Sequence, residues 1–385
     1  MLYYDMINEY ASTIFLYIGI ICVSSLFAKR AYRFDGKGFV ENRAFFIISL
    51  GILLLFLGFA DVGTDYENYR IIFLKSTDIS YWASTRIEKG YLFFNLIVRI
   101  FTSDFRVFHF VWAFVMLGLV FSTIWKYRFL INPGWAVLSY TTIFMFQSLD
   151  LMRMYLAIAV AFWGVRFYIE KKYYWYIGVI FAAFLIHKSA LCLIVPYVIW
   201  MFTRNKGRYF LKIAITSMLL VGLYFMRSYI FDGNFLGYGY LARATGTLGM
   251  IWVIYHMPIA ILLVPQLIKR EKDDLLEMLF VYFCISIIFW ILSYFVDAIG
   301  RATYYFTYPF IILPQYLMLK SERNIALKEQ DAFCVRKKWT LTVNRVITRK
   351  TFWKLLFIIY YFFRAYMMLG YLVADGIESY SNIIF

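Results

Sequence analysis

Cysteine and charge are both scarce in this chain, and each shortage excludes a class of protein. Only four cysteines occur in 385 residues, without CxxC spacing, which excludes a disulfide framework and a zinc site. We therefore expect no metal and no cofactor. Charged residues make up 16% of the chain and hydrophobic residues 63%, which excludes a water-soluble globule because no soluble core could enclose that much apolar side chain. The composition indicates a polytopic membrane protein.

Acidic residues are few relative to basic ones, and the basic excess is unevenly placed. There are 23 Asp and Glu against 39 Lys and Arg. If the N-terminus is outside, 27 of the 39 Lys and Arg fall in cytoplasmic loops, as expected if basic residues stay inside. The net charge of +16 therefore reports topology, and we expect no nucleic-acid partner. This orientation places both termini outside and the basic loop 320–354 in the cytoplasm, against membrane lipid headgroups.

Long apolar runs divide the chain into transmembrane segments. A helix needs about 20 apolar residues to cross a bilayer. We expect an all-α protein with one transmembrane domain over 1–385 and about twelve spans: 12–28, 44–60, 107–125, 134–149, 154–169, 173–187, 189–203, 209–226, 251–268, 275–294, 302–319 and 355–374.

The longest outer loop, residues 61–106, has a composition of its own. It opens with the polar stretch GTDYENY and contains TRIEKGYLFFNLIVRIF at 85–101, with apolar residues at helical spacing. This segment is short and charged, so we expect an interfacial or re-entrant helix that forms a lid over a site at membrane level. We expect Glu88 in this lid to pair with Lys89 or Arg86.

Charged side chains recur where the other outer turns meet the apolar runs. They are Asp150 and Arg153, His187, Arg243, and Asp297 with Arg301. Charges beside hydrocarbon are costly unless they are paired or functional. Arginine presents a planar fork of donors that matches phosphate oxygens, and tyrosine can stack on a sugar face. The outer surface is therefore suited to a lipid-linked diphosphosugar.

Five stretches, in this order, carry a family resemblance. They are GTDYENY (63–69), EKGY (88–91), DLMRMYLA (150–157), IHKSA (186–190) and the region from Arg301 to Tyr305. Together they resemble the EpsG family, which is related to the Wzy-type polymerases of bacterial surface polysaccharides. The resemblance covers roughly residues 12–320.

The resemblance implies a glycosyltransferase of the cytoplasmic membrane. Undecaprenyl-diphosphate-linked oligosaccharide repeat units would be joined on the outer face, to make capsule, O-antigen or exopolysaccharide, with a chain-length regulator as a possible partner. Arg153, Arg301 and Arg243 would hold the diphosphate, with Asp150 beside Arg153 and Tyr66 against the substrate. Asp65 or His187 would accept the hydroxyl proton.

Each of these residues also has a structural explanation. Asp65 could bond backbone N–H groups in a turn at Gly63, and His187 could cap a helix. Arg153 and Arg301 could extend to lipid headgroups. A lipid-linked oligosaccharide flippase or other polysaccharide transporter, a membrane acyltransferase using His187, and a ligase that uses the same donor are the alternative functions.

Overall fold

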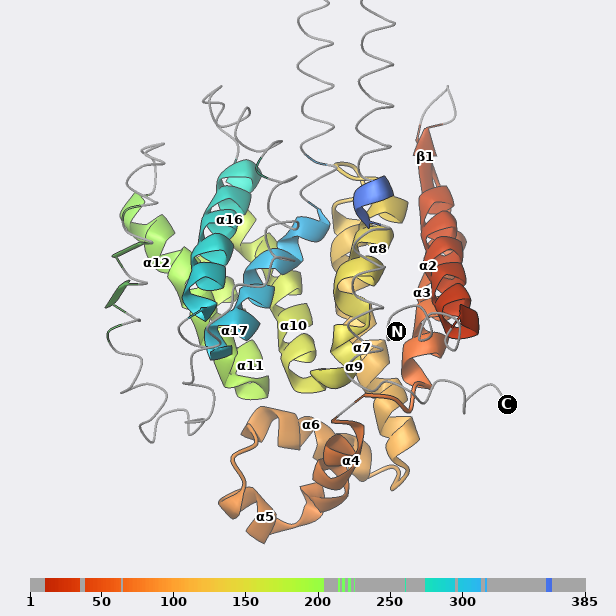
Figure 1. The fold of residues 1–385 in the computed structure, drawn as a ribbon, viewed down its shortest axis with the longest axis vertical. Helices are drawn as coiled ribbons and strands as arrows, with labels where there is room; N and C mark the ends of the chain where they lie inside the picture. The colour runs from red at the N-terminus through yellow and green to blue at the C-terminus, as the bar shows by residue number, and fades with distance from the viewer. Residues whose placement is uncertain are drawn as a thin grey trace, which may run out of the picture. The chain divides into compact units, whose positions relative to one another are not determined.

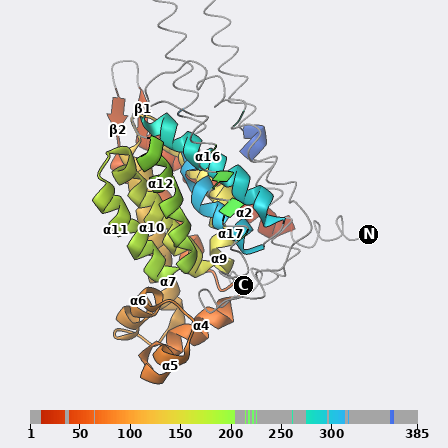
Figure 2. The ribbon, with the colours of Figure 1, turned by 90° about the vertical axis from the view of Figure 1, so that its left-hand side faces the viewer.

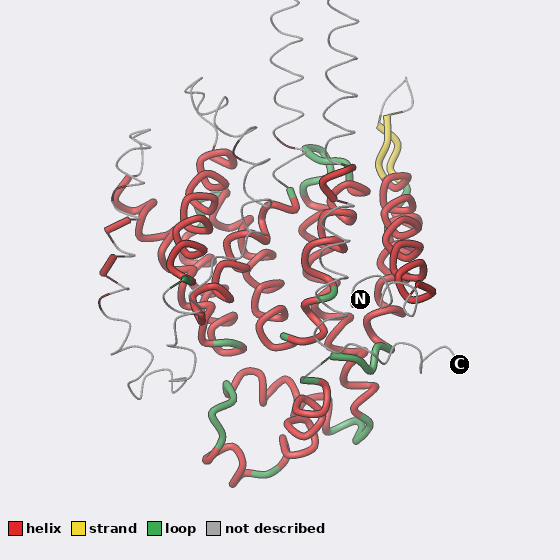
Figure 3. Tube along the Cα trace, in the orientation of Figure 1, coloured by secondary structure: helices red, strands yellow, loops and turns green. Residues whose placement is uncertain are grey.

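The computed structural model describes residues 11–34, 39–63, 65–203, 274–294 and 297–312, with isolated helical positions at 214, 217–218, 221–222, 225, 260, 316 and 358–361. These residues are mostly helical, as the sequence predicts (Figures 1 and 3). The chain divides into two compact units. The first contains residues 1–67, 124–150 and 311–385, and the second residues 68–123 and 151–310.

The first unit is built on a helical hairpin. Helix α2 packs on α3 and on α8, and the α2–α3 connection is an antiparallel pair of strands in which Tyr32 lies opposite Glu41. Asn42 caps α3 by accepting from Ala44 N, and Asn132 with Pro133 begins α8. The elements are α2 (Ala11–Ala31), β1 (Tyr32–Phe34), β2 (Phe39–Glu41), α3 (Arg43–Gly58), α8 (Pro133–Tyr140), the π-helical turn η2 (Thr141–Met145) and α9 (Gln147–Asp150).

Apart from a few end residues, the remaining elements belong to the second unit. Its main contacts are α10 with α11 and α16 with α17. The Tyr176 and Tyr282 hydroxyls, 2.8 Å apart, join α11 to α16 in the interior. The elements are α4 (Tyr66–Leu74), η1 (Lys75–Thr77), α5 (Ile79–Ser84), α6 (Lys89–Arg99), α7 (Phe105–Lys126), α10 (Met152–Ile169), α11 (Tyr173–Ile186), η3 (Lys188–Leu193), α12 (Ile194–Thr203), α16 (Asp274–Ser293), α17 (Asp297–Thr307) and η5 (Tyr308–Ile311).

Three helices among the described residues are long and apolar enough to cross a membrane: Phe105–Lys126, Met152–Ile169 and Leu275–Ser293. They coincide with expected spans, and Arg43–Gly58, Tyr173–Ile186 and Lys188–Ile199 are shorter apolar helices. The count of about twelve stays a prediction. The expected spans 209–226, 251–268 and 355–374 and the loop 320–354 lie wholly or largely outside the described residues.

Four local features differ from the expectation. The β1–β2 pair is not helical, and the outer loop 61–106 contains the helices α4 and α5 ahead of α6. The expected span 189–203 begins with the 3-10 turn η3, and the one expected at 302–319 begins at Asp297 and becomes the 3-10 turn η5 at Tyr308. Pro309 has no N–H to donate, which is a physical reason for α17 to end there.

Helices α4, α5 and α6 gather at one end of α10 and α11 in the second unit (Figures 1 and 2). A close approach fixes α6 there. A Cβ on Gly90 would lie 2.5 Å from Leu185 O and 2.7 Å from Leu185 Cβ, so only glycine allows α6 to rest on the end of α11. This contact brings the first turn of α6 beside the turn that follows α11.

Candidate functional site

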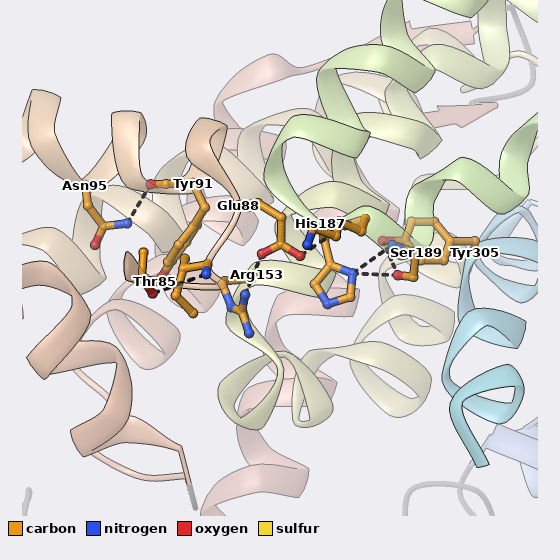
Figure 4. Close-up of polar contacts among 10 residues, drawn as sticks. Thr85, Glu88, Tyr91, Asn95, Arg153, His187, Ser189 and Tyr305 are labelled. Carbon is orange, nitrogen blue, oxygen red and sulfur yellow. Dashed lines mark hydrogen bonds and ion pairs between the residues drawn. The ribbon is translucent and has the colours of Figure 1, made fainter. Parts of the chain in front are cut away.

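A buried carboxylate lies where α6 meets α11. Glu88 is the N-cap residue of α6 and is 4% exposed. Its Oε2 accepts from Arg153 Nη1 at 2.5 Å, and its Oε1 accepts from the Lys188 backbone N–H at 3.2 Å (Figure 4). A buried carboxylate needs such partners because removing a charge from water is costly. Glu88 thus joins α6, α10 and the start of η3.

The partner of Glu88 corrects the sequence-based expectation. We expected Lys89 or Arg86, but the ion pair is with Arg153, 65 residues away. The ammonium of Lys89 instead donates to the carbonyl oxygen of Trp82. Arg153 accordingly contacts the start of α6, and this contact depends on tertiary packing that no local sequence pattern predicts.

A break between two helices positions Arg153. Leu151, with φ −115° and ψ 48°, separates α9 from α10, and Trp112 Nε1 donates to Met152 O at 3.1 Å. Arg153 is therefore in the first turn of α10, where the positive end of the helix dipole disfavours a cation. The carboxylate of Glu88 offsets that disadvantage.

His187 lies in the turn between α11 and η3, outside the three helices that are long enough to span. Its Nδ1 is 2.5 Å from Ser189 Oγ, and Ser189 Oγ donates to the Tyr305 hydroxyl at 3.2 Å. The Ser189 backbone N–H donates to Nδ1 at 3.4 Å, so His187 caps η3, as its structural explanation predicts. Among the residues that the structure describes, the hydrogen bonds to the His187 ring are made at Nδ1 and none is made at Nε2.

The charges around His187 come from several elements. Burial lowers the pKa of His187 to about 4; the Glu88 carboxylate opposes this, and Arg153, Arg301 and Lys188 add to it. The ring is therefore neutral at neutral pH. The fields of both arginines reach the same imidazole, although Arg153 is on α10 and Arg301, which is exposed, is on α17.

Helix α17 supplies both Arg301 and Tyr305. Residues four apart lie on the same face of a helix, one above the other. Tyr305 is 2% exposed and reaches Ser189, so its helix face is directed at the turn containing His187. The arrangement gathers two guanidinium groups, one carboxylate and a neutral imidazole at the end of the bundle.

The other predicted site residues are placed differently. Asp65, Tyr66 and Asp150 belong to the first unit, where Gly63 adopts φ +123° and a Cβ there would lie 3.2 Å from Asp150 Oδ1. The Tyr66 N–H donates to Gly63 O at 3.1 Å, so Asp65 lies within this turn before α4. The GTDYENY and DLMRMYLA motifs therefore touch through Gly63 and Asp150. Arg243 lies outside the described residues.

Three site residues were missed by sequence reasoning. Glu88 was assigned to a local pair, and neither Ser189 nor Tyr305 was given a role of its own. Glu88 and Ser189 belong to the EKGY and IHKSA motifs, which could have marked them. Tyr305 likewise belongs to the stretch from Arg301 to Tyr305 that carries the family resemblance.

Within the described residues, no group of three or more His, Cys, Asp or Glu could hold a metal ion. Cys22, Cys192 and Cys284 are free thiols, and Cys334 lies outside the described residues. The chemistry available at the site is therefore that of guanidinium, carboxylate, imidazole and hydroxyl groups.

Apolar helices with an ionic cluster at their ends define the class: an α-helical membrane protein with a charged site at the end of its bundle. The sequence model of the EpsG family matches residues 43–328, and the chain belongs to that family, as its motifs indicate. The family is consistent with a polymerase-like role in polysaccharide biosynthesis. Neither a curated protein nor a solved structure matches the chain.

Proposed function

We propose that this protein is a polysaccharide polymerase of the bacterial cytoplasmic membrane. It joins undecaprenyl-diphosphate-linked oligosaccharide repeat units on the outer face, with both termini on that side. The observation that supports the proposal is the Arg153–Glu88 ion pair, which is bonded to the turn that contains His187 and faces α17, the helix of Arg301, through the Ser189–Tyr305 hydrogen bond. When the donor sugar is released from a lipid diphosphate, cations are needed to neutralise the departing diphosphate. A neutral base is needed to accept the proton of the attacking hydroxyl.

The proposed reaction is a glycosyl transfer by a single displacement. A hydroxyl of the acceptor repeat unit attacks the anomeric carbon of the donor sugar, and the bond from that carbon to the diphosphate oxygen breaks. The hydroxyl proton passes to the protein, and undecaprenyl diphosphate leaves with the electron pair. Positioning and charge stabilisation supply most of the rate in such a reaction.

Arg153 and Arg301 stabilise the departing diphosphate. Glu88 bonds the Arg153 guanidinium at Nη1, whereas a guanidinium carries five N–H donors in a fixed fork. The ion pair with Glu88 orients the guanidinium group of Arg153. The negative charge of Glu88 also balances the positive charge of Arg153 when no substrate is bound. The sequence also predicts substrate contacts for Arg243, Asp150 and Tyr66, and it offers Asp65 as the alternative proton acceptor.

We assign the proton transfer to Nε2 of His187. In this assignment the ring proton is on Nδ1 and is donated to Ser189 Oγ at 2.5 Å, while the one hydroxyl proton of Ser189 is donated to Tyr305. The backbone contact at 3.4 Å is near the limit of a hydrogen bond and opposes this tautomer only weakly. Nε2 then has a lone pair that can accept a proton.

The test is a membrane assay with a purified lipid-linked repeat unit. The polymerase assignment predicts a ladder of lengthening glycans on the lipid carrier. Movement of the intact lipid-linked unit across the bilayer would identify a flippase, an acylated product an acyltransferase, and transfer of finished glycan to a different acceptor a ligase. Any of these three outcomes without a ladder would overturn the assignment.

A further inference from the structure

Helix α6 has an apolar face that no described part of the protein covers. Phe93, Ile97, Ile100 and Phe101 are 56%, 42%, 71% and 83% exposed, at spacings of four, three and one. They form one stripe along α6 and the turn after it. We call these four residues the α6 stripe. The opposite face of α6 is buried against the rest of the second unit.

The α6 stripe leads directly into a helix that is able to cross a membrane. Only residues 100–104 separate the end of α6 from α7, which begins at Phe105. Phe101 therefore lies four positions before the start of a candidate span. The boundary between water and lipid must fall near this point, because the hydrocarbon region begins with α7.

Basic side chains accompany the stripe. Residues 68–106 contain six Lys and Arg against three Asp and Glu, and one of those acids, Glu88, is buried and paired with Arg153. Lys75, Arg86, Lys89 and Arg106 are exposed. An apolar stripe with surrounding cations is the pattern of a helix that lies in the plane of an anionic lipid surface.

We propose that α6 docks on the lipid surface beside the start of α7, with the α6 stripe in the boundary between headgroups and acyl chains. The other end of the same helix carries Glu88, whose carboxylate bonds Arg153 and Lys188 N, and Gly90, which rests on Leu185. Docking therefore holds the Glu88–Arg153 pair in place. The docking itself does not depend on the chemistry assigned to the site.

The experiment measures depth in the bilayer, so its result is separate from activity. The four native cysteines are replaced by alanine in the full-length protein, one cysteine is introduced by Ile97→Cys, and a nitroxide is attached. The protein is reconstituted in vesicles of phosphatidylcholine and phosphatidylglycerol. The matched control carries Ser84→Cys, at an exposed polar position on α5.

For the nitroxide at position 97, the proposal predicts a collision rate with lipid-soluble oxygen at least severalfold higher than that with a water-soluble nickel complex. For the nitroxide at position 84 it predicts the reverse. Equal access of the nickel complex to both positions would overturn the proposal. Low collision with both reagents at 97 would also overturn it, since protein, either a second copy or another segment of this chain, would then cover the stripe.

A pair of charged variants tests the coupling to the site. Ile97→Glu with Phe101→Glu places two carboxylates in the stripe and is predicted to lower the rate of the vesicle-bound enzyme about tenfold or more while the protein remains inserted. Thr77→Glu, an exposed polar position of the same segment, is predicted to leave the rate unchanged. Equal rates for both variants would contradict the coupling, and the label measurement would still decide the docking.

Discussion

Two Arg–Glu ion pairs within the described part of the chain differ in their surroundings. Arg128 bonds Glu41 at 2.7 Å in the first unit, with its guanidinium carbon 4.1 Å from the ring centre of Phe129 and 4.7 Å from that of Trp125. Arg153 bonds Glu88 at 2.5 Å in the second unit, beside His187 and within the electrostatic reach of Arg301.

Arg128 lies among aromatic rings and the β1–β2 strand pair, so its charge stabilises the fold. It fastens β2 to the turn after α7, and Arg128 Nη1 also donates to Trp125 O at 3.0 Å. Arg153 is held by a carboxylate that is almost fully buried, in a cluster of further cations. This difference in setting, more than the presence of either arginine near an apolar helix, is the basis for our proposal that Arg153 binds substrate and Arg128 does not.

The largest expected effect comes from removing each carboxylate in turn. Glu88→Ala leaves the partly buried Arg153 without its carboxylate and should lower the free energy of unfolding by about 3–5 kcal/mol. Glu41→Ala removes a carboxylate that is 33% exposed; its cost should be at most about 1 kcal/mol. Thermal unfolding of both variants in the same lipid discs measures the difference, and equal losses would remove the distinction between the two pairs.

The contact of α6 with α11 can be loosened without changing any charge. Gly90→Ala places a Cβ 2.5 Å from Leu185 O, which forces α6 away from α11 and weakens the bond from Lys188 N to Glu88. We expect at least a tenfold loss of polymer formation in a membrane assay. Gly118→Ala on α7, where a Cβ meets nothing within 4 Å, is the matched control and should retain full activity.

Tyr305→Phe tests how the His187 ring is held. Without the tyrosine oxygen, the Ser189 hydroxyl turns its proton to Nδ1 and the ring proton moves to Nε2, which removes the proposed base. The turnover rate should fall about tenfold, a typical lower range for a displaced proton acceptor, with substrate affinity unchanged. Tyr304→Phe on the same helix should leave both quantities unchanged, and an affinity loss for Tyr305→Phe would assign that residue to binding.

The protonation of His187 gives a prediction about stability at low pH. Burial lowers the pKa of His187 from 6.5 to about 4, so the folded protein binds fewer protons than the unfolded chain between these values. The stabilising contribution of the neutral ring is complete above pH 6.5 and is lost as the pH falls toward about 4. A His187→Gln variant should show a smaller loss of unfolding free energy over this range. Identical pH profiles would place the titration elsewhere.

The sequence predicted the long helices well because their apolar runs dominate locally. Helices α7 and α10 begin and end within two residues of the expected spans, as does α16. The short helices α4 and α5 and the β1–β2 pair lack such runs and are stabilised by tertiary contacts, so no periodicity indicated them. The GTDYENY and DLMRMYLA motifs marked segments that do meet, through Gly63 and Asp150.

The candidate site could be predicted only in part. Arg153, His187 and Arg301 each stand out as polar groups beside apolar runs, and both arginines act electrostatically on His187. Their roles in a site stay predictions. Their connections, Glu88 to Arg153 and Ser189 to Tyr305, join residues 65 and 116 positions apart and depend on how the helices pack. A single sequence contains no signal for such pairs.

The most direct measurement of the central claim separates the charge of Arg153 from its structural pairing. The double variant Arg153→Ala with Glu88→Gln removes both partners, so no unpaired carboxylate remains to destabilise the protein. The account predicts a folded, membrane-inserted protein whose glycan ladder collapses to single repeats, with a rate loss of about a hundredfold or more. Long chains from that double variant would contradict the assignment of Arg153 to the diphosphate.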